Sequence, residues 1–178
     1  NIRNSVAATA VALTVGISIP NIKKGLLNFK GVQRRFNKIF SYKEIDFYDD
    51  YAHHPTEIKV VLEGVNQVYE GYDKVCIFQP HRISRLKDLR KEFSFAFKKA
   101  DTVILCPVYS AGEKIKLGFS YLNFAKEIIK NSKVRLFLVN NNDQLAIFLK
   151  KNMYGKKIVI GMGAGTISNW MKNLPQLM

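Results

Sequence analysis

The chain has 178 residues, 47% of them hydrophobic and 24% charged, which is typical of a folded domain that needs no disulfide support. The net charge of +14 fits a nucleic-acid surface, a phosphate-bearing ligand or lysines on solvated helix faces. Because the lysines are spread along the chain, we do not expect nucleic-acid binding. Cys76 and Cys106 lie in apolar runs, so reduced buried thiols and a cytoplasmic protein are expected.

The first 44 residues differ from the rest of the chain. The apolar stretch 5–16 is too short to span a membrane and resembles no signal peptide, so we expect no membrane partner. An alanine-rich helix is predicted up to Gly16, followed by a helix with Ser18 as its cap and Pro20 in its first turn. Neither helix has a strand partner. We therefore interpret 1–30 as the end of a preceding domain and 31–44 as a linker with extended segments near 33–40.

From residue 45 onward, short β-branched runs alternate with amphipathic stretches. The expected strands are 45–49, 74–78, 102–106, 135–139 and 157–161. The buried faces of the first two long helices are predicted to carry Ile58, Val61, Leu62, Val65, Val68 and Tyr69, and then Leu86, Leu89, Phe93, Ala96 and Phe97. Two shorter helices are expected near 120–131 and 143–152. This alternation predicts an α/β fold: a Rossmann-like, mostly parallel sheet over 45–178 with helices on both faces.

Polar residues concentrate where the predicted strands end. The stretches "DDYAHHP", "QPHRISR", "PVYSAGE" and "GMGAGT" each follow a strand. Because the carboxyl ends of parallel strands meet at one edge, these stretches predict a ligand site there. Pro55 suits the first turn of a helix, and His53 and His54 lie beside that helix's free N–H groups, where an anion is attracted. Asp49 and Asp50 suit hydroxyls, a metal or a cation instead.

The second polar stretch carries a cluster of cations. We expect Ser84 to cap the helix that begins near Arg85. Arg82 and Arg85 then stand at the positive end of that helix, which indicates an acidic ligand, a carboxylate or a phosphate. All three histidines of the chain, His53, His54 and His81, fall at this edge.

The same residues admit several alternative interpretations. No cysteine joins the histidines and their spacing fits no zinc set, so no metal site is predicted. A Ser-His-Asp hydrolase would need a nucleophile elbow, which the sequence lacks. The glycines of "GMGAG" favour a tight turn over a dinucleotide fingerprint, because no second half with an acidic ribose ligand follows. Tyr109 and Glu113 fit either ordinary loop residues or site residues.

The stretches "DDYAHHPTEI", "FQPHRISRLKDL" and "PVYSAGE" resemble the C-terminal domain of the Mur ligases, and "NIRNSVAATAVALTVGI" and "FKGVQRRF" resemble the end of their central domain and the hinge after it. "GMGAGTI" matches the family's late glycine turn. The resemblance implies that 1–30 closes a central ATPase domain, 31–44 is the hinge and 45–178 is the C-terminal domain. It implies an ATP-dependent acid–amino-acid ligase of peptidoglycan precursor synthesis.

In the branch of the family that these motifs resemble, ATP phosphorylates the carboxylate of UDP-N-acetylmuramate, and the amine of L-alanine attacks the acyl phosphate. A muropeptide-recycling ligase is the alternative within the family, since it shares a similar DD-x-x-HHP stretch, although "FQPHR" is not expected there. A basic Rossmann-like module that binds nucleic acid or protein is the alternative outside it.

The resemblance also implies roles for individual residues. Nucleotide contacts are implied for Asn1, Asn4, Arg35, Asp49 and Asp50, and substrate contacts for Tyr51, His53, His81, Arg82 and Arg85. No catalytic residue is implied within the chain.

The chain also departs from the family pattern. ATP and magnesium are implied cofactors, but the Gly-rich phosphate loop, the magnesium ligands and the N-terminal domain that holds the uridine diphosphate are not in this chain, nor is a histidine expected just before Asn1. Ala52 replaces a usual glycine and Ile83 a common aromatic residue. We therefore predict that the chain alone does not turn over ATP.

Overall fold

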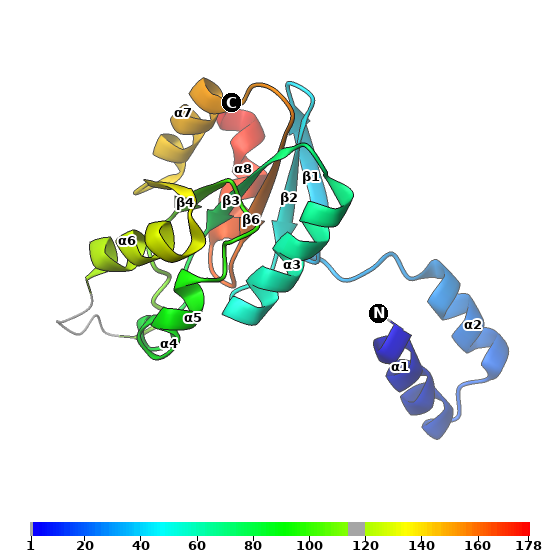
Figure 1. Cartoon of the computed structure of the whole chain (residues 1–178). Helices are drawn as coiled ribbons and strands as arrows, with labels where there is room; N and C mark the ends of the chain where they lie inside the picture. The colour runs from blue at the N-terminus through cyan, green and yellow to red at the C-terminus, as the bar shows by residue number, and fades with distance from the viewer. Residues whose placement is uncertain (1, 114–119) are drawn as a thin grey trace. The chain divides into compact units, whose positions relative to one another are not determined.

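The computed structural model describes residues 2–113 and 120–178, and the chain divides into two compact units, Asn1–Gln33 and Arg34–Met178. The first unit holds α1 (Ile2–Thr14) and α2 (Ile19–Asn28), as the sequence predicts (Figure 1). Neither helix has a buried residue. Pro20 lies in the first turn of α2, but the Ser18 side chain makes no capping hydrogen bond. Over the described residues, every helix is too short or too polar to cross a lipid bilayer.

The second unit is built on one six-stranded sheet in the order β1-β2-β6-β3-β4-β5. The strands are β1 (Asn37–Tyr42), β2 (Ile45–Asp50), β3 (Asp73–Phe78), β4 (Thr102–Leu105), β5 (Arg135–Leu138) and β6 (Lys157–Met162). All neighbours pair in parallel except β1, which is antiparallel to β2. All five expected strands are present, with ends shifted by at most one residue, and the prediction of a mostly parallel α/β sheet is confirmed.

Strand β1 lies within the segment that the sequence assigned to a linker. It forms a hairpin with β2, and the two turn residues, Lys43 and Glu44, have φ of 50° and 64° as a type I′ turn requires. Phe40 stacks on Phe47 at 4.3 Å between ring centroids. Residues 34–44 therefore belong to the second unit. The sequence did not reveal this hairpin because its turn has neither glycine nor asparagine.

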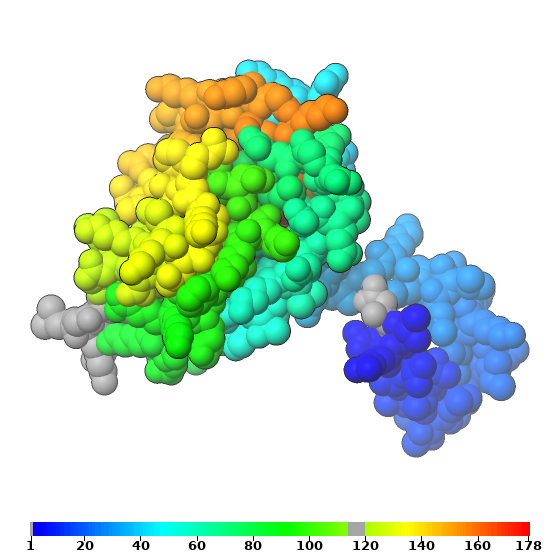
Figure 2. All heavy atoms as spheres, viewed as in Figure 1, coloured from blue at the N-terminus to red at the C-terminus, as the bar shows by residue number. Residues whose placement is uncertain are grey.

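Helices cover both faces of the sheet. One face carries α3 (Pro55–Val68), α4 (Ile83–Asp88), α5 (Arg90–Ser94) and α6 (Tyr121–Ser132), and the other carries α7 (Asn142–Asn152) and α8 (Ile167–Leu177). Figure 2 shows α3, α5 and α6 side by side over the first face. The core between the layers is largely apolar, and fully buried side chains such as Phe78 and Phe93 each contribute about 1.5–3 kcal/mol of transfer free energy.

Most of the predicted core residues are buried, with two differences in detail. Val68 is 76% exposed because α3 ends at that residue. The helix expected after Ser84 is divided into α4 and α5 at Leu89, although Leu86, Phe93 and Phe97 are fully buried as expected.

Cys76 and Cys106 are free and buried, and burial raises the pKa of both thiols, that of Cys106 to about 12.

Candidate functional site

The carboxyl ends of the four central strands β2, β6, β3 and β4 lie at one edge of the sheet, because these strands run in parallel. The segments that follow them are joined by backbone hydrogen bonds. Gln79 N–H donates to Met162 O at 3.0 Å and Cys106 N–H to Phe78 O at 2.9 Å. The four polar stretches of the sequence therefore form one continuous rim.

Four rings form a row across this rim. The centroids of Tyr51 and His53 are 5.2 Å apart, and those of His53 and His81 are 5.8 Å apart, both edge to face. His81 stacks on Tyr109 at 5.5 Å with an interplanar angle of 24°. The row joins the segments after β2, β3 and β4. Tyr109, for which the sequence allowed either a loop role or a site role, is therefore part of the candidate site.

The cations lie at one end of this row. Arg85 Nη1 is 3.3 Å from His81 Nδ1, while the Arg82 side chain is exposed. Burial, then Arg85, His53 and Arg82, lower the pKa of His81 below its usual 6.5. His81 is thus held neutral at neutral pH, and its ring nitrogen can accept a hydrogen bond from Arg85. The structure therefore brings Tyr51, His53, His81 and Arg85 together, with Arg82 beside them in the chain.

The cap of α4 differs from the prediction. Ser84 lies inside the helix, and the residue before α4 is Arg82, whose φ of 66° is unusual for a non-glycine residue. The Ser84 hydroxyl and N–H donate to Glu113 Oε1 and Oε2 at 2.6 and 3.1 Å. The cap comes from a carboxylate on the segment after β4, which spacing along the chain could not predict.

The anion site expected at the start of α3 is filled by the chain itself. Pro55 opens the helix as predicted. The Glu57 carboxylate accepts the N–H groups of His53 and His54 at 2.9 and 3.1 Å. Thr56 N–H donates to His54 Nδ1 at 3.3 Å, so His54 caps its own helix. The N–H groups of His53 and His54 therefore already have an acidic partner.

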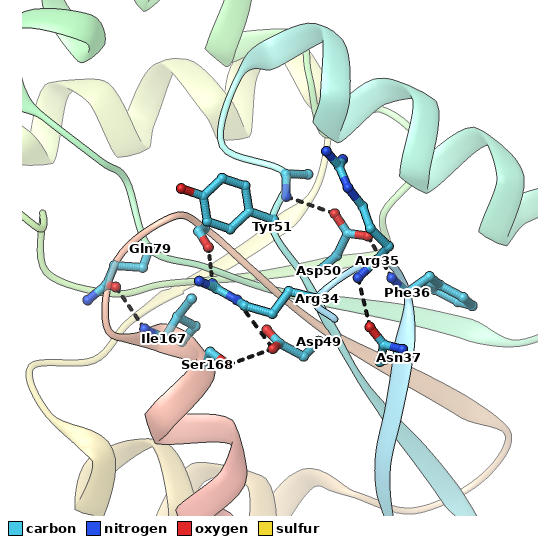
Figure 3. Close-up of polar contacts among 12 residues, drawn as sticks. Arg34, Arg35, Phe36, Asn37, Asp49, Asp50, Tyr51, Gln79, Ile167 and Ser168 are labelled. Atoms are coloured by element: carbon cyan, nitrogen blue, oxygen red, sulfur yellow. Dashed lines mark hydrogen bonds and ion pairs between the residues drawn. The ribbon is translucent and has the colours of Figure 1, made fainter. Parts of the chain in front are cut away.

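A buried ion pair lies at the β2 end of the rim (Figure 3). Asp49 is 3% exposed, and its Oδ2 accepts the Ser168 hydroxyl at 2.6 Å and lies 3.4 Å from Arg34 Nε. Arg34 also donates to the Gly163 carbonyl, and its guanidinium lies 4.8 Å from the centre of the Tyr51 ring. Sequence reasoning named Arg35 and missed Arg34, because adjacent arginines in one motif cannot be told apart by spacing.

Asp50 has a different environment from Asp49. Its two carboxylate oxygens accept the N–H groups of Ala52 and Phe36 at 2.7 and 2.8 Å. Burial raises the pKa of Asp50, and these two hydrogen bonds oppose the rise. Both oxygens are therefore used to hold the backbone on either side of β2, where Phe36 leads into β1.

The other proposed nucleotide residues are less enclosed. The Arg35 side chain is exposed, and its N–H donates to Asn37 Oδ1 at 2.8 Å. Asn4 is exposed on α1 in the first unit, and Asn1 lies outside the described residues.

Gln79, which sequence reasoning also missed, holds the late glycine turn. Its side chain accepts Ile167 N–H at 2.9 Å and donates to the Thr166 hydroxyl at 3.0 Å, at the start of α8. A Cβ at Gly163, whose φ is +148°, would lie 2.6 Å from Gln79 O, and one at Gly165 would lie 2.6 Å from Gln79 Oε1. These glycines permit close packing of the turn against Gln79, as the tight-turn interpretation predicted.

Fold and rim together define a Rossmann-like domain with a polar rim at the carboxyl edge of its sheet, where domains of this class bind ligands. Residues 34–165 match the family model described as Mur ligase, glutamate ligase domain. The chain therefore belongs to the Mur ligase family and contains its C-terminal domain.

Relatives whose names state a function agree with this assignment. The chain is 71% identical over 177 residues to the UDP-N-acetylmuramate–L-alanine ligase of Pelagibacter ubique, and covers 38% of that protein. It is 39% identical over 175 residues to the ligase of the same name from Bartonella tribocorum, of which it covers 37%. The chain thus spans little more than a third of the length of these relatives.

Solved structures show the same fold. The UDP-N-acetylmuramate-alanine ligase of Thermotoga maritima superposes with a TM-score of 0.70 and 27% identity, over 99% of this chain and 37% of that one. A murein peptide ligase from Psychrobacter arcticus gives a TM-score of 0.74 at 19% identity, over 99% of this chain and 36% of that one. At that identity, the second match supports the fold alone.

Proposed function

We propose that the protein containing this chain is an ATP-dependent amide ligase that joins L-alanine to UDP-N-acetylmuramate in the cytoplasm, as a step of peptidoglycan precursor synthesis that serves cell shape and division. The chain contributes the domain that recruits the amino acid. The observation that carries the proposal is the cluster of His81, Arg82 and Arg85 on the rim, in a chain 71% identical to a ligase of that name.

The cluster suits the carboxylate of an amino acid. Arginine guanidinium groups bind carboxylates with two parallel hydrogen bonds. The exposed Arg82 precedes α4, and Arg85 follows three residues later, within the first turn of that helix. The neutral His81 leaves these charges uncompensated. Because its Nδ1 accepts the hydrogen bond from Arg85, its Nε2 carries the proton and can donate to an oxygen of the same carboxylate. Binding in this way orients the amine for attack on an acyl phosphate, and such positioning provides much of the rate in this type of reaction.

The β2 end of the rim fits a nucleotide hydroxyl. Asp49 Oδ1 is buried and has no hydrogen-bond partner among the described residues, so one acceptor of this carboxylate is unused. This property supports the expectation that Asp49 faces the ribose of ATP. The backbone bonds of Asp50 give it a supporting role, and Arg35 with its exposed side chain remains available to the phosphates.

Magnesium would neutralise phosphate charge in this reaction. Within the part of the chain that the structure describes, no three His, Cys, Asp or Glu side chains gather as a metal-binding group. The described residues therefore offer the ion no preformed set of ligands, and we assign its ligands to the rest of the protein, as the family resemblance implies.

The proposal is tested with the full-length protein. Purified enzyme is mixed with ATP, UDP-N-acetylmuramate and either L-alanine or the L-alanyl-γ-D-glutamyl-diaminopimelate tripeptide, and phosphate release and the product mass are measured. We expect release with alanine. Release with the tripeptide alone would identify a recycling ligase, and release with neither would contradict the proposal.

The same assay applies to the chain of 178 residues by itself. Because it carries no phosphate-binding loop, we expect no phosphate release above background. Phosphate release that depends on both UDP-N-acetylmuramate and alanine would show that the chain holds a complete active site.

A further inference from the structure

We propose that Glu113 is a positioning residue for the amino-acid site: it fixes the first turn of α4 and so sets the directions of Arg82 and Arg85. The inference rests on the proposed function, because the ligand held by those arginines is the amino-acid carboxylate. Glu113 touches neither guanidinium group in a hydrogen bond among those described; it acts through Ser84, which lies between the two arginines in sequence.

Helix α4 needs an external support. It has only six residues, Ile83–Asp88, and helices this short are unstable by themselves. The residue before it, Arg82, supplies no side-chain cap and has a left-handed backbone with φ of 66°. The first turn that carries the arginines is therefore held by partners from elsewhere in the chain.

Both partners come from the β4 loop, residues 107–113. Arg82 N–H donates to Tyr109 O at 2.8 Å, and the hydroxyl and N–H of Ser84 donate to the two oxygens of Glu113. Tyr109 also stacks on His81. The β4 loop thus contacts three consecutive parts of the cationic stretch: the His81 ring, the Arg82 backbone and the first turn of α4.

The shape of the β4 loop returns Glu113 toward α4. Glu113 N–H donates to Ser110 O at 3.0 Å, which closes a turn whose central residues, Ala111 and Gly112, have φ of 51° and 84°. Such a turn favours glycine at its second central position because the left-handed backbone is strained for other residues. The sequence "SAGE" therefore encodes both the turn and the carboxylate that follows it.

The charge of Glu113 suits this role. Its hydrogen bonds to Ser84 lower the pKa of Glu113, and Arg82 contributes to the same shift, so the group stays ionised at neutral pH. A carboxylate beside the first turn of a helix is stabilised by the positive end of the helix dipole. Since both oxygens are engaged by Ser84, Glu113 leaves the guanidinium groups free for an incoming carboxylate.

The test compares Glu113→Ala, Glu113→Gln and Ser84→Ala in the full-length enzyme. For Glu113→Ala we expect the KM for alanine to rise about tenfold, with kcat at saturating alanine and the KM for ATP within about twofold of wild type. Glu113→Gln keeps an acceptor oxygen and should restore part of the loss. Ser84→Ala removes one of the two bonds and should give a smaller rise. Glu63→Gln, an exposed acid on α3, is the matched control and should change nothing.

The outcomes separate the two proposals. If wild type uses alanine and Glu113→Ala leaves the alanine KM unchanged, the positioning role is wrong and the proposed function stands. If Glu113→Ala raises the KM for ATP equally, or lowers the melting temperature in proportion, its role is only structural. If wild type uses the tripeptide instead of alanine, the variants are compared with that substrate. A wild type inactive with both contradicts both proposals.

Discussion

The two ends of the rim use charged residues in opposite ways. At the β2 end, the buried Asp49 binds both Arg34 and Ser168; we call this the closed end. At the β3 end, His81, Arg82 and Arg85 are partly exposed, and the nearby Glu113 is engaged by Ser84; we call this the open end. One concentration of polar residues therefore serves two purposes. The closed end stabilises the turn after β6, and the open end is available for an anion.

The largest expected effect is at the closed end. Replacing Arg34 with alanine leaves the buried Asp49 without its cation, and breaking such a pair costs about 3–5 kcal/mol of unfolding free energy. The free energy of unfolding is measured by urea denaturation of the chain. Arg35→Ala is the matched control, because its side chain is exposed, and should cost less than about 0.5 kcal/mol. Equal losses in the two variants would remove the distinction between the ends.

The next effect is at the open end. Arg85→Ala removes the guanidinium beside His81 and should raise the KM for alanine of the full-length enzyme about a hundredfold. The urea midpoint should stay close to that of wild type, because Arg85 has no acidic partner within ion-pair distance among the described residues. Lys87→Ala, an exposed cation on the same helix, is the control. An unchanged KM for alanine would show that Arg85 does not bind the alanine carboxylate.

Asp50 adds a smaller test of the structural role. Asp50→Ala leaves the N–H groups of Phe36 and Ala52 without their acceptor and should lower the free energy of unfolding by about 2 kcal/mol. In the full-length enzyme, the KM for ATP should stay close to that of wild type. A large rise in the KM for ATP with unchanged stability would indicate that Asp50 binds the nucleotide.

The smallest expected effect is the pH dependence that His81 contributes. Its pKa is lower in the folded chain than in the unfolded one, so the unfolded chain binds the proton first as the pH falls below 6.5. The contribution of His81 to stability is therefore complete above pH 6.5 and is lost as the pH falls toward its folded pKa. Urea midpoints measured from pH 8 to pH 5 should fall less in His81→Gln than in wild type. Identical slopes would show that His81 titrates normally.

Much of the fold was predictable because its signals are local. Alternating β-branched runs and helical faces gave every parallel strand, and the rule that ligands bind at the carboxyl edge of such sheets gave the rim. The contacts that the sequence did not reveal join residues over long sequence separations. Gln79 holds the start of α8, and Glu113 caps α4 from the β4 loop. A cap supplied by a distant segment leaves no periodic signal, and so Ser84 was assigned the role that Glu113 has.

The most direct test of the open end compares L-alanine with L-alaninamide, which lacks the carboxylate, as acceptors for the full-length enzyme. If Arg85 binds that carboxylate, wild type should prefer alanine in kcat/KM by about a hundredfold or more, and Arg85→Ala should lose most of this preference. The Arg35→Ala variant should keep it. An Arg85→Ala enzyme that discriminates as well as wild type would contradict the central claim that the open end recognises the amino-acid carboxylate.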